Sequence, residues 1–166
     1  MGYFVNQGKI KDVEVEYSKE FEKKDGGTWE EDIYMKIIVQ DVEKDWDSNI
    51  EIKGSYKTDD DDIITSRGSA FKPLNALEAC DVKIEFEDVD GKLVDDFKNN
   101  KVHLTKAFFP EGFKDKMLGK TIYYIKYDTK SGTKWTYDLI GKSKEALENN
   151  FLRSASQGYV RNYTGA

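Results

Sequence analysis

Four consecutive aspartates at positions 59–62 are the densest group of side chains able to bind a metal ion. Metal-dependent nucleases hold Mg²⁺ with carboxylates, but those ligands come from separate elements that converge in the fold. A run of adjacent like charges is more typical of a solvated loop, and this run lacks the glycine and terminal glutamate of an EF-hand loop. The sequence therefore predicts no metal site at these residues.

The other residue types that carry out catalysis are nearly absent. His103 is the only histidine and Cys80 the only cysteine, which excludes two-histidine metal sites and internal disulfides. Neither a glycine-rich phosphate-binding loop nor a GxSxG nucleophile elbow occurs. We therefore expect a protein that is not an enzyme and has no cofactor and no metal.

Aromatic and basic residues interleave in the C-terminal third of the chain. Single-strand nucleic-acid binders stack bases on aromatic rings along a groove whose Lys and Arg follow the backbone. Because strand side chains alternate, Tyr124 and Lys126 share one face of their strand, and Trp135 and Tyr137 lie opposite Lys134 on the next. One face of this hairpin must be core, and the sequence leaves open which rings are exposed.

Charge is distributed unevenly along the chain. The net charge is −6, but residues 101–166 carry 12 basic and 6 acidic side chains, whereas residues 1–100 carry 14 basic and 26 acidic ones. A basic portion can attract a polyanion that the acidic portion repels. Arg153 and Arg161 belong to a segment, 153–166, without hydrophobic periodicity, which predicts a flexible tail able to hold a nucleic-acid backbone.

Hydrophobic periodicity and turn residues predict the elements that position these side chains. Residues 13–17 alternate strictly, the KKDGGT stretch at 23–28 and Asp90-Gly91 are typical of turns, and a turn with Ser131-Gly132 joins two aromatic-rich strands. Pro73 suits a first helical position and Ser143 a helix N-cap. The pattern predicts strands at 10–17, 33–42, 49–56, 82–86, 102–109, 121–127 and 133–140, and helices at 73–80, 113–118 and after Ser143.

Three strands, a helix and two further strands are the connectivity of an OB fold, a partly open five-stranded β-barrel. We predict a mainly β, barrel-like fold with a helix between the third and fourth strands and a C-terminal helix; the alternative is an α+β sandwich. One domain is expected over residues 1–152, with an insert at about 82–110. No window of 18 apolar residues or apolar leader occurs, so no membrane association is expected, and the single cysteine favours a cytoplasmic location.

Three stretches resemble the OB-fold single-stranded DNA-binding proteins of tailed bacteriophages. They are the β-rich start at 10–56, the Arg67-Gly68-Ser69-Ala70-Phe71-Lys72 lead into a helix, and the Leu118-Gly119-Lys120 step before the final hairpin. The long insert at 82–110 and a C-terminus without an acidic tip depart from the family pattern. The resemblance implies single-stranded DNA binding without sequence preference during phage replication or recombination, in the cytoplasm of a host cell.

The sequence thus predicts single-stranded DNA as the partner, with replication or recombination proteins and a second copy of the chain as further candidates. Two alternatives are an acidic DNA mimic that occupies a host protein through carboxylates such as Glu14 and Glu16, and a minor virion or assembly component. The residues predicted to bind DNA are Arg67, Phe71, Lys72, Lys120, Tyr124, Lys126, Lys134, Trp135, Tyr137, Arg153 and Arg161.

Overall fold

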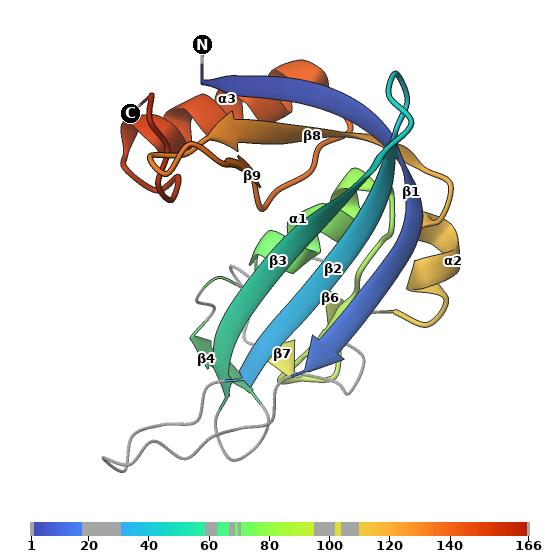
Figure 1. Ribbon diagram of the computed structural model, residues 1–166. Helices are drawn as coiled ribbons and strands as arrows, with labels where there is room; N and C mark the ends of the chain where they lie inside the picture. The colour runs from blue at the N-terminus through green and yellow to red at the C-terminus, as the bar shows by residue number, and fades with distance from the viewer. Residues whose placement is uncertain are drawn as a thin grey trace.

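A curled six-stranded antiparallel sheet forms the body of the protein (Figure 1). The computed structural model describes residues 2–17, 31–58, 63–66, 69, 71–94, 102–103 and 110–165. The strand order is β4-β3-β2-β1-β8-β9. The strands are β1 (Tyr3–Tyr17), β2 (Glu31–Asp41), β3 (Asp47–Thr58), β4 (Ile64–Ser66), β8 (Thr121–Asp128) and β9 (Lys134–Thr136).

Strand β1 belongs to both halves of the sheet. Its first half pairs with β8, where Tyr3 lies opposite Tyr127, and its second half pairs with β2, where Tyr17 lies opposite Ile33. The register shifts between Ile10 and Asp12, which is the kind of irregularity that bends a strand. The bend, visible in Figure 1, lets the sheet curl so that β9 comes next to β3.

The period-two pattern of β2 and β3 produces the barrel core. Ile33, Met35, Ile37 and Val39 are fully buried on one face of β2, and β3 contributes Ile50 and Ile52 on the same side. Their outward neighbours are polar except for Ile38 on β2, as expected for strands with one face largely in water. The core continues to α1 through Leu77 and to β8 through Ile122 and Tyr124.

The described residues add three helices to this sheet: α1 (Phe71–Ala79), α2 (Phe113–Met117) and α3 (Lys144–Ser156). Helix α1 begins two residues before the predicted start, so Pro73 is its third residue. Proline is tolerated there because the first N–H groups of a helix have no intrahelical acceptor. At α3 the prediction is confirmed, since the Ser143 hydroxyl accepts a hydrogen bond from the Ala146 N–H at 3.3 Å.

The predicted insert forms a second, small sheet in the part that the structure describes. Its order is β6-β5-β7, with β5 (Phe86–Asp88), β6 (Leu93–Val94) and β7 (Val102–His103). The predicted strand at 82–86 is wrong for its first four residues, because the strand begins at Phe86. The Asp90-Gly91 turn between β5 and β6 is confirmed, and Gly91 has a φ of 81° that favours glycine.

The C-terminal segment differs from the predicted flexible tail. Arg153 and the next three residues continue α3, and Val160 and Tyr163 are buried in a second apolar cluster between β8 and α3. There the ring centroid of Tyr163 lies 5.2 Å from that of Phe151 and 5.7 Å from that of Tyr127. The segment is therefore part of the domain rather than an appendage to it.

The fold is mainly β, and β3, β2, β1, β8 and β9 form a nearly closed antiparallel barrel-like sheet, consistent with an OB-like fold. A helix between the third strand and β8, and a C-terminal helix, complete the predicted arrangement. In the part of the chain that is described, no hydrogen-bonded ladder joins β3 to β9, so the barrel has an open edge between them. No helix of the described residues is both long and apolar enough to cross a bilayer.

Candidate functional site

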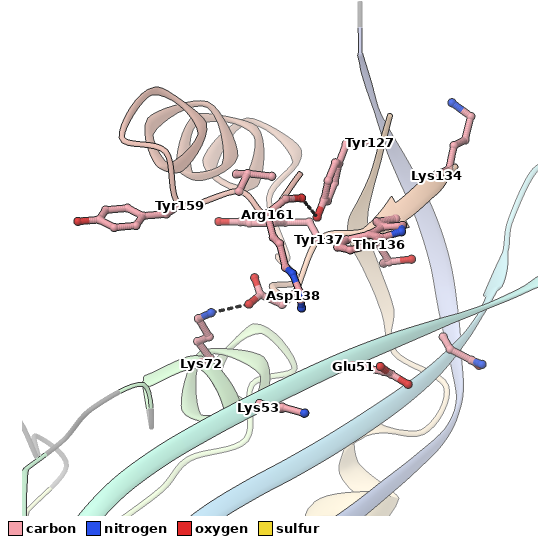
Figure 2. Close-up of a pocket in the computed structure, with 13 residues that line it drawn as sticks. Glu51, Lys53, Lys72, Tyr127, Lys134, Thr136, Tyr137, Asp138, Tyr159 and Arg161 are labelled. Atoms are coloured by element: carbon pink, nitrogen blue, oxygen red, sulfur yellow. Dashed lines mark hydrogen bonds and ion pairs between the residues drawn. The ribbon is translucent and has the colours of Figure 1, made fainter. Parts of the chain in front are cut away.

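A groove of about 690 Å³ lies at the open edge of the barrel, between β3 and β9 (Figure 2). One wall comes from β3 and the start of α1, and the other from β9 and the C-terminal segment. The groove contains more basic than acidic side chains, together with several aromatic rings. Its lining residues are Asn49, Glu51, Lys53, Lys72, Tyr127, Lys134, Trp135, Thr136, Tyr137, Asp138, Tyr159, Val160 and Arg161.

Arg161 and Trp135 form the aromatic and cationic centre of this groove. The guanidinium carbon of Arg161 lies 5.4 Å from the centroid of the half-buried Trp135 ring, within the range of a cation–π contact. The Tyr127 hydroxyl donates a hydrogen bond of 3.0 Å to the Arg161 carbonyl oxygen, which fixes the backbone there. Tyr159, nearby on the same segment, is 78% exposed and presents a free ring face to solvent.

Two of the groove lysines are held by carboxylates. The Lys72 Nζ donates to Asp138 Oδ2 at 2.5 Å across the groove, as Figure 2 shows, and the Lys134 Nζ donates to Asp128 Oδ1 at 2.6 Å. Lys53, on β3, lies 5.9 Å above the Tyr34 ring. Lys72 and Lys134 are therefore neutralised by carboxylates of the protein itself, whereas the contacts shown for Lys53 and Arg161 are with aromatic rings.

The start of α1 is fastened to β3, and this places Lys72 at the groove. The Ser69 N–H donates to the Ser55 carbonyl oxygen at 3.0 Å, and the Ser55 N–H donates to the Ser69 hydroxyl at 2.9 Å. The Lys72 N–H donates to the Ser69 carbonyl oxygen at 3.1 Å. Phe71, beside Lys72, is 45% exposed but does not line the groove.

Two of the predicted stacking residues are buried. Tyr124 has no exposed surface, and its hydroxyl donates to Asp41 Oδ2 at 2.8 Å, so its ring belongs to the barrel core and cannot stack on a base. Tyr137 is 5% exposed; burial raises the pKa of its hydroxyl, and that hydroxyl donates to Ser154 Oγ at 3.2 Å. Tyr137 reaches the groove only as part of its wall.

The other residues predicted to bind DNA differ in where they lie relative to the groove. Lys72, Lys134, Trp135, Tyr137 and Arg161 converge on the groove, and Lys126 lies beside it with its Nζ 5.7 Å from the Trp46 ring. Lys120 precedes β8 and Arg153 is in the last turn of α3, both exposed and outside the groove. Arg67, the 23–28 turn and the four aspartates at 59–62 lie outside the described residues.

Several groove residues were missed by sequence reasoning. Asn49, Glu51 and Lys53 alternate with Ile50 and Ile52, so their outward orientation was readable from the sequence. The sequence did not show that these residues would face β9, because β9 lies more than eighty positions further along the chain and comes close to β3 only in the folded protein. Asp138 had no sequence signal beyond its charge.

The described residues offer no group of three or more His, Cys, Asp or Glu side chains placed to hold a metal ion. The groove instead combines rings and cations, which favour an elongated anion bearing flat aromatic groups. Comparison of the chain with protein-family models, with curated proteins and with solved structures found no match.

Proposed function

We propose that the protein binds single-stranded DNA without sequence preference and without catalysis, in the groove between β3 and β9. The observation that carries the proposal is the pairing of Trp135 with Arg161 in a groove that also contains Tyr159, Lys53 and Lys134. Exposed ring faces accept bases of any sequence, because every base has a π-face, while cations attract phosphates. The phage replication or recombination setting rests on the family resemblance alone.

The barrel geometry supports a single strand over a duplex. The groove lies at one edge between two strands, and its rings are accessible only to bases that are not already paired and stacked. A duplex exposes its phosphates but hides the faces of its bases, so it would contact the lysines of the groove and not its aromatic rings. Preference for single strands is therefore the property that distinguishes this proposal from simple polyanion binding.

The DNA-mimic alternative requires rows of carboxylates at phosphate-like spacing. In the described part of the sheet, Glu14 on β1 lies opposite Lys36 on β2, which lies opposite Glu51 on β3. Opposite charges thus alternate across the three strands at this position. Along β1, Asp12, Glu14 and Glu16 share one face, but Asp12 is paired with Lys114 at 3.0 Å and Glu14 lies opposite Lys36, so cations interrupt this row of carboxylates. We therefore favour the strand-binding function.

Fluorescence anisotropy of a labelled oligo-dT of about 30 nucleotides tests the proposal, with a duplex of equal length beside it. We expect tighter binding to the single strand, weakening as salt rises because phosphate contacts release counterions. Replacing Trp135 with Ala should weaken binding by about five-fold or more, since one stacked base contributes about 1–3 kcal/mol. Absence of binding at low salt, or equal affinity for duplex, would overturn the proposal.

Lys116→Ala provides the matched control for cation removal. Lys116 is an exposed lysine on α2, which packs against β1 and does not line the groove. Arg161→Ala should weaken binding and lower the salt slope, whereas Lys116→Ala should change neither by more than the experimental error. Equal effects of both substitutions would mean that the protein attracts DNA through its overall charge rather than through the groove.

A further inference from the structure

Two large rings are exposed beside the groove on the face where β1 and β8 meet the β2–β3 turn. Phe4 is 54% exposed and Trp46 is 48% exposed. Lys134 lies 4.6 Å from the Phe4 ring centroid, and Lys44 and Lys126 lie 4.5 Å and 5.7 Å from that of Trp46. We name these five residues the Phe4–Trp46 platform.

The platform is continuous with the groove through the strand register. Phe4 on β1 lies opposite Lys126 on β8, and Lys126 lies opposite Thr136 on β9. Cross-strand partners share a face of the sheet, so these three side chains form one row. Thr136 lines the groove, and so does Lys134, which also contacts Phe4.

The turn that carries Trp46 is held in place. Asp41 Oδ1 accepts hydrogen bonds from the N–H groups of Glu43 and Lys44, at 2.8 and 2.9 Å. The Asp41 N–H donates to the Trp46 carbonyl oxygen at 3.0 Å. The Trp46 ring is thus exposed on a turn of fixed geometry, which lowers the entropic cost of binding a ligand to it.

The charges around the platform favour ring stacking over phosphate attraction as its contribution. Lys134 is paired with Asp128, and Glu43 and Asp45 are exposed on the same turn as Lys44. Asp47, next to Trp46, is paired with Lys11 at 3.1 Å. The basic and acidic side chains largely offset one another, whereas the two rings remain accessible.

We propose that the Phe4–Trp46 platform is a second base-stacking site, which takes the nucleotides of a single DNA strand that leave the groove past Thr136. This inference rests on the proposed function, because it extends the path of the same strand. It predicts that one protein molecule contacts more nucleotides than the groove alone can hold. It also predicts that the added affinity depends on the two rings and little on salt.

A length series of labelled oligo-dT, from about 4 to about 20 nucleotides, tests the inference by anisotropy. Wild-type affinity should rise with length and then level off. Trp46→Ala should weaken binding of the long oligonucleotides by about five-fold or more, leave the shortest ones unchanged, and leave the salt slope unchanged. Trp46→Phe, which keeps a ring, should retain most of the long-strand affinity.

The possible failures are distinguishable. No binding of any length by the wild-type protein overturns the proposed function, and with it this inference. Binding that Trp46→Ala and Phe4→Ala leave intact at every length overturns the inference only, as does an equal loss at all lengths. Circular dichroism of each variant verifies folding, and Trp46 lies on an exposed turn outside the core.

Discussion

The Tyr124 hydroxyl donates a hydrogen bond of 2.8 Å to Asp41 Oδ2, joining the middle of β8 to the end of β2. Burial opposes ionisation of Asp41, but this bond and those from two backbone N–H groups more than offset it, so the pKa of Asp41 lies below its usual value. Burial and the same carboxylate raise the pKa of Tyr124 to about 12. The pair thus ties the β2–β3 turn, and with it Trp46, to the barrel core.

Tyr124→Phe should destabilise the protein by about 1.5–3 kcal/mol, the range for a hydrogen bond to a charged group. The ring still fills its place in the core, so the loss reports the hydrogen bond. Urea unfolding measures it. Tyr123→Phe is the matched control, because the described residues give the Tyr123 hydroxyl no hydrogen-bond partner, and its effect should stay within about 0.5 kcal/mol. Similar losses in both variants would contradict this assignment.

The lowered pKa of Asp41 predicts acid sensitivity. Because the folded state favours the ionised carboxylate, its stabilising contribution is present above the ordinary aspartate pKa of about 3.9 and is lost as pH falls through the lower folded-state value. The stability difference between wild type and Asp41→Asn should therefore be large at about pH 7 and shrink at about pH 3. Urea unfolding across this range tests it, and a constant difference would refute it.

Asp138→Asn should tighten binding of oligo-dT by about two- to five-fold, since it removes a carboxylate that competes with phosphate for Lys72 and the surface ion pair itself is worth at most about 1 kcal/mol. Glu145→Gln, on the first turn of α3, makes the same charge change outside the groove. Anisotropy titration compares the two variants. Equal gains in both would assign the effect to net charge rather than to the release of Lys72.

Tyr163→Ala should destabilise the protein by about 3 kcal/mol, since its ring is buried against Phe151 and Tyr127. It should also weaken oligo-dT binding, because the same segment positions Arg161. Tyr159→Ala, at a ring that is 78% exposed, should leave stability unchanged. Denaturant unfolding distinguishes the two variants. An unaltered unfolding midpoint for Tyr163→Ala would contradict the packing of this segment and support the flexible tail that the sequence predicted.

Local sequence patterns predicted the long strands, the helices and their order, but they missed β4 and β6 and extended the last strand to residue 140, whereas β9 ends at Thr136. Alternating residues on β2 and β3 specify strands with one buried face, and the Ser131-Gly132 turn specifies the last hairpin, where Gly132 has a φ of 83°. These signals are local, because side-chain period and turn chemistry depend on neighbours in the chain. They were sufficient for the mainly β, barrel-like fold and for five of the residues that line the groove.

Which aromatic rings are exposed depends on contacts that form only when the chain is folded. Strand β8 is covered on both faces, with Tyr124 against the barrel core and Tyr127 against α3. The alternation of side chains separated the two faces of this strand, but it could not show that neither face is open to solvent. Likewise, the segment that contains Val160 and Tyr163 has no hydrophobic periodicity. These two residues are buried because they pack against Phe151 and β8, which lie near them only in the folded chain. The open edge between β3 and β9 has the same origin, since contacts between distant segments, and not local propensity, fix where a sheet fails to close.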